Sequence, residues 1–168
     1  VLEVGCYVGG FLRTASDMGA SATGIDPNPQ VVELCNRMGT SAHVGTVEEW
    51  TSPEQLDVVA ILNCFDQLPD PVSTLTIIQS LLRPGGSVIV RTPNARWIRE
   101  MYRCGDRGMR ISAACELVLG VPFLRCYSPH AVAALLSGAG FNEPTMRLPP
   151  LDLERPRPES PWIDVCAV

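Results

Sequence analysis

The chain has 168 residues, of which 46% are hydrophobic and 18% charged, and its net charge is −5 at pH 7. This size and apolar content predict one domain with its own core, and the acidic balance argues against a general nucleic-acid surface. No run approaches the roughly 18 consecutive apolar residues of a membrane span, and no secretory leader is visible, so the expected location is the cytoplasm.

Seven cysteines are scattered along the chain without a CxxC pair. An odd, dispersed set predicts reduced thiols that act as small buried hydrophobic residues, and it argues against a disulfide framework or a metal site. The first residue is not Met and already falls in a predicted strand, which indicates a domain that is incomplete at its N-terminus.

The first 26 residues predict a strand, a glycine-bearing turn, a helix and a second strand. The first strand ends at Gly5, the helix runs from Gly9 to Gly19, and the second strand ends at Asp26. Ligands of open parallel α/β sheets bind beyond the carboxyl ends of the strands, where a carboxylate can accept hydrogen bonds from two ribose hydroxyls. A dinucleotide turn would also need glycine at position 7, which is Tyr7 here. The pattern therefore favours a ligand with a nucleoside but no pyrophosphate.

Helices and strands continue to alternate up to residue 94. Helices are predicted to begin at Asn28–Pro29 and at Asp70–Pro71, because Asn or Asp can cap a helix and Pro fits its first turn. Apolar, β-branched runs predict strands at 41–44, 56–62 and 87–90. Helical periodicity assigns further apolar residues to the inward helix faces, among them Met18, Leu34, Met38 and Val72.

Residues 94–120 interrupt the alternation and predict a helical insert. Its first helix carries Arg96, Arg99 and Arg103 on one side, and its second helix covers 111–119. The arginine stripe indicates either a solvated face or a docking surface for an acidic substrate or carrier domain. A helix that begins at Ser128–Pro129 and strands at 143–148 and 162–167 complete the predicted elements.

Three stretches together resemble the S-adenosylmethionine-dependent methyltransferases with a Rossmann-like fold. They are Glu3-x-Gly5-x-x-x-Gly9 followed by Gly24-Ile25-Asp26, the loop Asp66-Gln67-Leu68-Pro69-Asp70-Pro71, and a leucine-rich helix that leads into Arg83-Pro84-Gly85-Gly86 and a β-branched strand. The resemblance covers about residues 1–94. It implies a single α/β domain over 1–168: a three-layer α/β/α sandwich with a mostly parallel seven-stranded sheet and an antiparallel last strand.

The resemblance also implies S-adenosylmethionine as cofactor, with S-adenosylhomocysteine as product, and it implies no metal. Glu3 would reach the methionine amino end, and Asp26 would hold the ribose hydroxyls. Thr46 stands where the family often has an Asp that faces the adenine, and Glu48 is the other residue that could take this role. The remaining cofactor contacts implied by the resemblance are Gly5, Cys6, Tyr7, Gly9, Pro27, Val47, Asn63 and Phe65.

The implied reaction is an in-line attack by a substrate O, N or C atom on the sulfonium methyl group, so catalysis rests chiefly on proximity and alignment. Asp66, Gln67 and Tyr127 are the residues expected to contact the substrate. Gln67 stands where the family commonly has His, so this loop is expected to position the substrate rather than deprotonate it. The expected partner is a small molecule, with an acidic or carrier-bound one as an option, and neither a membrane nor a nucleic acid.

Two other classes of protein remain open from the residues alone. A nucleotide-dependent oxidoreductase is disfavoured by Tyr7, whereas a methyltransferase-like binding or regulatory module without turnover fits the departures at Tyr7, Thr46 and Gln67. The chain has two histidines, expected as a satisfied strand residue at His43 and a surface residue at His130. With these two roles for its histidines, the chain is not expected to form the Cys-His or Ser-His-Asp arrangement of a hydrolase.

Overall fold

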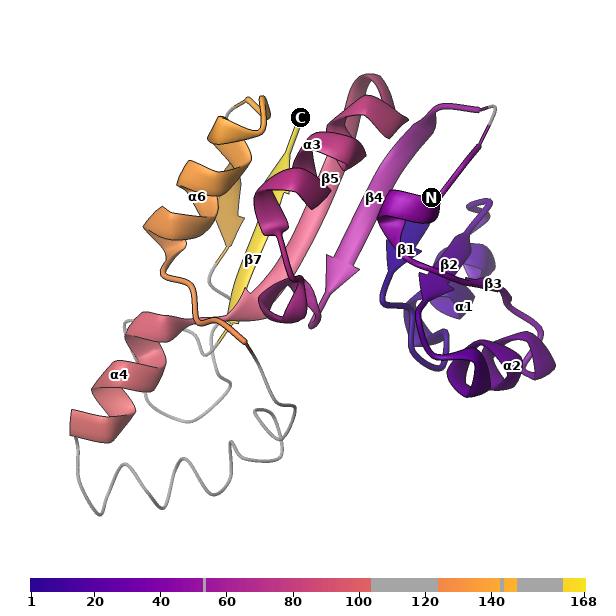
Figure 1. Cartoon of the computed structure of the whole chain (residues 1–168), viewed down its shortest axis with the longest axis horizontal. Helices are drawn as coiled ribbons and strands as arrows, with labels where there is room; N and C mark the ends of the chain where they lie inside the picture. Colours follow the sequence, from indigo (N-terminus) through magenta and orange to yellow (C-terminus); the bar gives the residue numbers. More distant parts are fainter. Residues whose placement is uncertain (53, 104–123, 143, 148–161) are drawn as a thin grey trace.

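The computed structural model describes residues 1–52, 54–103, 124–142, 144–147 and 162–168. These form a seven-stranded sheet in the order β3-β2-β1-β4-β5-β7-β6 (Figure 1). The strands are β1 (Leu2–Val4), β2 (Thr23–Asp26), β3 (Ser41–Val44), β4 (Leu56–Leu62), β5 (Leu82–Pro93), β6 (Thr145–Arg147) and β7 (Trp162–Ala167). The helices are α1 (Gly10–Asp17), α2 (Pro29–Arg37), α3 (Pro71–Leu81), α4 (Ala95–Arg103) and α6 (Pro129–Gly138), with 3-10 turns η1 (Val47–Glu49) and η2 (Phe65–Gln67).

The sheet is parallel from β3 to β5, and β7 runs antiparallel to both of its neighbours, β5 and β6. This topology confirms the predicted mostly parallel sheet with an antiparallel last strand. Val4 of β1 pairs with Ile25 of β2 on one side and with Ile61 of β4 on the other. The strand order therefore reverses next to β1, and the carboxyl ends of these three strands share one edge, which is where such sheets bind ligands.

Two hydrophobic clusters show how the helices cover the sheet. The larger joins Leu75 and Ile78 of α3 and Val132 and Leu136 of α6 to the buried side chains of the central strands, and α3 lies beside α6 in Figure 1. The smaller lies under α1 and α2 and contains Cys6, Leu12, Val32, Cys35 and Ala42. Apolar burial under both sets of helices is the main favourable term for this fold.

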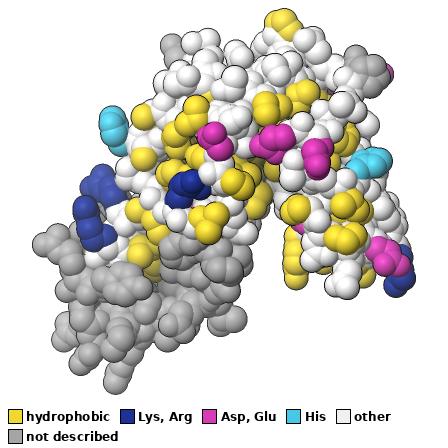
Figure 2. Space-filling view, viewed as in Figure 1, with side chains coloured by type: hydrophobic (Ala, Val, Ile, Leu, Met, Phe, Trp, Pro, Cys, Tyr) yellow, Lys and Arg dark blue, Asp and Glu magenta, His cyan; other side chains and the backbone are white. Residues whose placement is uncertain are grey.

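The helix starts predicted from capping residues are confirmed. Asn28 Oδ1 accepts from Gln30 N, and Asp70 Oδ1 accepts from Val72 N and Ser73 N, each before a proline in the first turn. Ser128 Oγ accepts from Ala131 N at the start of α6. Asn94 Oδ1 accepts from Arg96 N before α4, on which Arg96 and Arg99 are exposed. Basic side chains, dark blue in Figure 2, gather at the left of the molecule, on the side where Figure 1 shows α4.

Four residues assigned to inward helix faces are exposed, and those assignments were wrong. The exposed fractions are 83% for Met18, 45% for Leu34, 48% for Met38 and 48% for Val72. Short helices bury only a narrow stripe: Leu12 in α1, and Val32 with Cys35 in α2. Met18 and Met38 follow the last helical residues and turn away from that stripe. The prediction of buried thiols is confirmed for Cys6 and Cys35, and it was wrong for Cys126 and Cys166, which are exposed.

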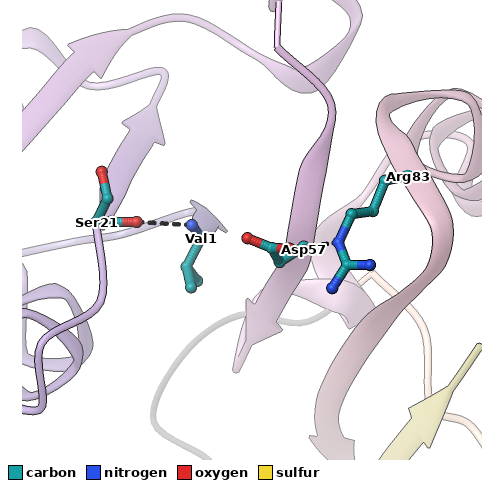
Figure 3. A network of polar contacts seen from close by, with 4 residues as sticks. All are labelled: Val1, Ser21, Asp57 and Arg83. Atoms are coloured by element: carbon teal, nitrogen blue, oxygen red, sulfur yellow. Dashed lines mark hydrogen bonds and ion pairs between the residues drawn. The ribbon is translucent and has the colours of Figure 1, made fainter.

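The fifth strand begins earlier than predicted. β5 pairs Leu82 with Leu56 and then resumes with Ser87 opposite Val58, so residues 83–86 bulge out of the ladder. Arg83 in this bulge pairs with Asp57, at the amino end of the sheet, where Val1 N also donates to the Ser21 carbonyl oxygen at 2.7 Å (Figure 3). Both partners of the Arg83–Asp57 pair are more than half exposed, so it adds little to stability.

The predicted helix at 111–119 falls outside the described residues. Within the residues that the structure does describe, no helix is both long and apolar enough to cross a bilayer.

Candidate functional site

The turn after β1 is built on two glycines in the left-handed region. Gly5 has φ +70° and Gly9 has φ +75°. The Gly5 and Cys6 amides both donate to the Ile25 carbonyl oxygen, at 2.8 and 3.1 Å. A Cβ at Gly5 would lie 2.6 Å from Cys64 Sγ, and one at Gly9 would lie 2.6 Å from Cys35 Sγ. Neither position tolerates a side chain without movement of the thiol beside it, so the turn stays thin at the edge where ligands bind.

Asp26 closes the same edge from the end of β2. Its Oδ2 accepts from Tyr7 N at 3.2 Å, and its Oδ1 accepts from Asn28 N at 2.9 Å. One carboxylate thus ties the β1 turn to the start of α2. A carboxylate has about four lone-pair sites, so Asp26 keeps acceptor capacity for a pair of hydroxyls. Pro27, the next residue, is exposed beside it.

Glu3 is the buried acid of the site. It lies in β1 with 4% of its surface exposed, and its Oε2 has no hydrogen-bond partner. Burial raises the pKa of Glu3 to about 8, and the charge of Asp26 adds to the rise. A buried carboxyl group with an unused oxygen is a natural partner for a bound cation, which would restore its charge.

The loop after β3 presents Thr46 and tucks Val47 inward. Thr46 N donates to Glu49 Oε2 at 3.0 Å as part of a capping box for η1, and Thr46 is exposed while Val47 is 2% exposed. Glu48 Oε1 accepts from Thr74 Oγ1 of α3 at 2.8 Å. Glu48 is therefore engaged with α3, while the Thr46 hydroxyl donates to Glu49 Oε2 at 3.5 Å.

The loop after β4 is held by its backbone and by one buried ring. Asn63 is exposed with φ +63°, and its amide donates to the Arg91 carbonyl oxygen at 3.0 Å. Gln67 Nε2 donates back to the Asn63 carbonyl oxygen at 3.4 Å. Phe65 is fully buried, with its ring centroid 5.1 Å from that of Tyr127. Phe65 thus supports the loop from the core side, and its ring offers no surface to a ligand.

Asp66 and Tyr127 are brought together by backbone hydrogen bonds. The amides of Leu124 and Arg125 donate to the Asp66 carbonyl oxygen at 3.1 and 3.2 Å, and Arg125 Nη2 donates to the Pro69 carbonyl oxygen at 2.7 Å. Asp66 is 3% exposed with an unpaired Oδ1, and Tyr127 is 7% exposed with an unpaired hydroxyl.

The electrostatics of these two groups favour their neutral forms. Burial raises the pKa of Asp66. Burial also raises the pKa of the Tyr127 phenol, with a further rise from the Asp66 carboxylate, while Arg125 opposes the shift. A carboxyl oxygen can accept a hydrogen bond, and a phenol can donate as well as accept, so together they can hold a hydroxyl of a substrate.

Two further polar atoms at this end of the sheet were not predicted from the sequence. Thr92 Oγ1, near the end of β5, and Trp97 Nε1 of α4 are buried and lack hydrogen-bond partners. Thr92 could have been found from its place at the carboxyl end of a strand.

The two histidines differ in how well they were anticipated. His130 is exposed, as predicted. His43 is also exposed, on the edge strand β3 with its ring 5.8 Å from that of Trp50, so it is not an enclosed strand histidine. In the described part of the chain, no three His, Cys, Asp or Glu side chains are placed to hold a metal ion.

The fold places the protein in a known structural class. Two solved S-adenosylmethionine-dependent methyltransferases each match 99% of the chain. The one from Archaeoglobus fulgidus has a TM-score of 0.72 and 16% sequence identity, and the match covers 84% of its chain. The one from Thermotoga maritima, described as a possible histamine N-methyltransferase, has a TM-score of 0.70 and 19% identity, and the match covers 80% of its chain. At these identities the likeness establishes the Rossmann-like methyltransferase fold.

The chain belongs to the methyltransferase domain family, whose model matches residues 1–143. It is 33% identical over 102 residues to the ubiquinone biosynthesis O-methyltransferase of Aeromonas salmonicida, a match that covers 56% of this chain and 43% of that enzyme. The match thus spans less than half the length of that relative.

Proposed function

We propose that the chain binds S-adenosylmethionine at the shared edge of β1, β2 and β4 and transfers its methyl group to a small molecule. The observation that carries this proposal is the pair of acids at that edge: Asp26, with acceptor capacity left over, and Glu3, buried with an unused oxygen. The first suits vicinal ribose hydroxyls, and the second suits an ammonium group. The cofactor carries both groups, the hydroxyls on its ribose and the ammonium group at its methionine end.

The remaining residues of the edge fit the same ligand. The thin turn at Gly5, Cys6 and Gly9 lets the backbone approach it closely, while Pro27, Thr46 and the backbone of Val47 border the adenine. Asn63 flanks the methionine portion, and Phe65 acts only by supporting that loop. When bound, S-adenosylmethionine supplies an activated methyl group, so the protein's task is to align the acceptor and exclude water.

The acceptor is placed against the loop after β4 and the residues around 127. Asp66, Gln67 and Tyr127 are the proposed substrate contacts, and Asp66 Oδ1 and the Tyr127 hydroxyl lack partners within the described residues. The relatives act in ubiquinone biosynthesis on an oxygen atom, which supports a small acceptor with a hydroxyl group. An acidic or carrier-bound form of that acceptor fits the exposed Arg96 and Arg99 on α4. Such a reaction would take place in the cytoplasm.

Calorimetric titration with S-adenosylmethionine and S-adenosylhomocysteine tests the cofactor site. Asp26→Asn is expected to weaken both by on the order of 100-fold, because it removes charge-assisted bonds to two hydroxyls. Asp17→Asn, on the exposed end of α1, is the matched control and should bind like the wild type. A folded wild type that binds neither compound would refute the cofactor assignment.

Methyl transfer to a panel of phenols, alcohols, amines and carboxylic acids, free and as carrier thioesters, tests turnover through release of S-adenosylhomocysteine. With the best acceptor, Asp66→Asn is expected to raise KM about tenfold, because it removes a polar contact to the acceptor, while kcat changes little. Affinity for S-adenosylhomocysteine should stay within about twofold. Cofactor binding without methyl transfer to any acceptor would favour a binding module instead.

A further inference from the structure

Tyr7 adopts a backbone conformation that its side chain disfavours. Its φ is +46°, and Tyr7 and Asn63 are the non-glycine residues with positive φ in the part of the chain that the structure describes. Asn tolerates the left-handed region, whereas a bulky aromatic residue there is a strained outlier. Strain of this kind persists where the surrounding structure enforces it, and it clusters at functional sites.

Packing does not account for the strained tyrosine. The Tyr7 side chain is 66% exposed, so little apolar surface is buried in return. Its amide donates to Asp26 Oδ2, a bond that a glycine at this position would make equally well with no side-chain strain. The fold therefore requires the backbone of residue 7 but not its ring.

The position of the residue shows what the ring can reach. Tyr7 lies in the turn between Gly5 and Gly9, joined through its amide to Asp26, and this turn follows directly on the strand that carries Glu3. These are the two acids to which the ribose and the ammonium end of the cofactor are assigned. The sulfonium charge of the cofactor lies between its ribose and its ammonium group, and the face of an aromatic ring attracts a cation within about 6 Å.

We propose that Tyr7 is a cofactor-positioning residue, whose ring packs against the sulfonium-bearing segment between the groups bound by Asp26 and Glu3. This inference rests on the proposed function. The ring face is the acting part, so the hydroxyl is dispensable. The Asp26 carboxylate accepts a hydrogen bond from the Tyr7 amide and also binds the ribose. It therefore fixes the position of the Tyr7 ring relative to the bound cofactor.

The test compares three replacements of Tyr7 by calorimetry and thermal unfolding. Tyr7→Gly and Tyr7→Asn both remove the ring and relieve the strain, and they differ in backbone freedom. Both are expected to weaken S-adenosylmethionine binding about tenfold, and to weaken binding of the uncharged S-adenosylhomocysteine less. Both should also raise Tm by about 2–4 °C. Tyr7→Phe should keep the wild-type affinity within about twofold.

Higher stability with lower affinity is the signature that a purely structural role would not produce. Unchanged or tighter binding by both ring-less variants would overturn the proposal, and tighter binding would mean that the ring obstructs the site. If the wild type binds and Asp26→Asn does not, but the Tyr7 variants bind like the wild type, the cofactor site stands and the role of Tyr7 falls. A folded wild type that binds neither compound would overturn both.

Discussion

Replacing Glu3 with glutamine is expected to raise the free energy of unfolding at pH 8 by at most about 4 kcal/mol, and at pH 5 by less than about 1 kcal/mol. The reason is that the folded protein holds Glu3 in a buried position, where its pKa is raised to about 8 from an ordinary value of 4.5. Glutamine mimics the protonated side chain and has no proton to lose.

The sign follows from proton binding. Between about pH 4.5 and pH 8, the unfolded chain has released the Glu3 proton and the folded chain still binds it. Stability therefore falls as pH rises through this window, and it levels off above it. Urea unfolding of the wild type and Glu3→Gln at pH 5, 6, 7 and 8 measures the difference in slope. Glu54→Gln, at an exposed position, is the control. Parallel slopes in all three proteins would contradict the prediction.

Cofactor binding should act on the same proton. A cationic ammonium group beside Glu3 favours its charged form, so the affinity for S-adenosylhomocysteine is expected to rise from pH 6 to pH 8, with release of a proton on binding. In Glu3→Gln the affinity should be lower and that rise absent. Calorimetry in two buffers of different ionisation enthalpy counts the proton.

The sequence was sufficient for the sheet and for the helix starts because those signals are local. Asn28, Asp70 and Ser128 each precede a proline, and each caps a helix in the structure. Asp26 could be placed at the ligand edge because the end of a parallel strand fixes its position. Its hydrogen bond to Tyr7 N fits the same placement, because Tyr7 follows β1, and β1 pairs with β2, the strand that ends at Asp26.

The side-chain positions that could not be predicted from the sequence depend on contacts between residues far apart along the chain. Phe65 follows a strand and was interpreted as a cofactor contact, but contact with Tyr127, far along the chain, turns its ring into the core. Glu48 was a second candidate for the adenine contact, but its Oε1 accepts a hydrogen bond from Thr74 Oγ1 of α3. The thiols of Cys35 and Cys64 looked like ordinary small residues. Their role next to Gly9 and Gly5 depends on residues 26 and 59 positions away in the sequence.

Gly5→Ala tests how strongly the Cys64 thiol constrains the turn after β1. It is expected to lower the free energy of unfolding by about 2–4 kcal/mol. Two effects add: the left-handed φ of +70° and a new Cβ 2.6 Å from Cys64 Sγ. Since Cys64 Sγ also donates to the Val4 carbonyl oxygen at 3.1 Å, it cannot move aside without losing that bond.

A matched glycine separates the two effects. Gly19 has φ +88° and open space where an added Cβ would lie, so Gly19→Ala should lose only about 1 kcal/mol, the share of the dihedral alone. Placing Gly5→Ala in a Cys64→Ala background removes the 2.6 Å contact and leaves one of 3.1 Å to the Cβ, so the double variant should recover part of the loss as a coupling free energy. Equal losses at Gly5 and Gly19, with no coupling to Cys64, would mean that the thiol does not shape the turn. A measurable coupling would show that the Cys64 side chain, in the loop after β4, supports the turn after β1.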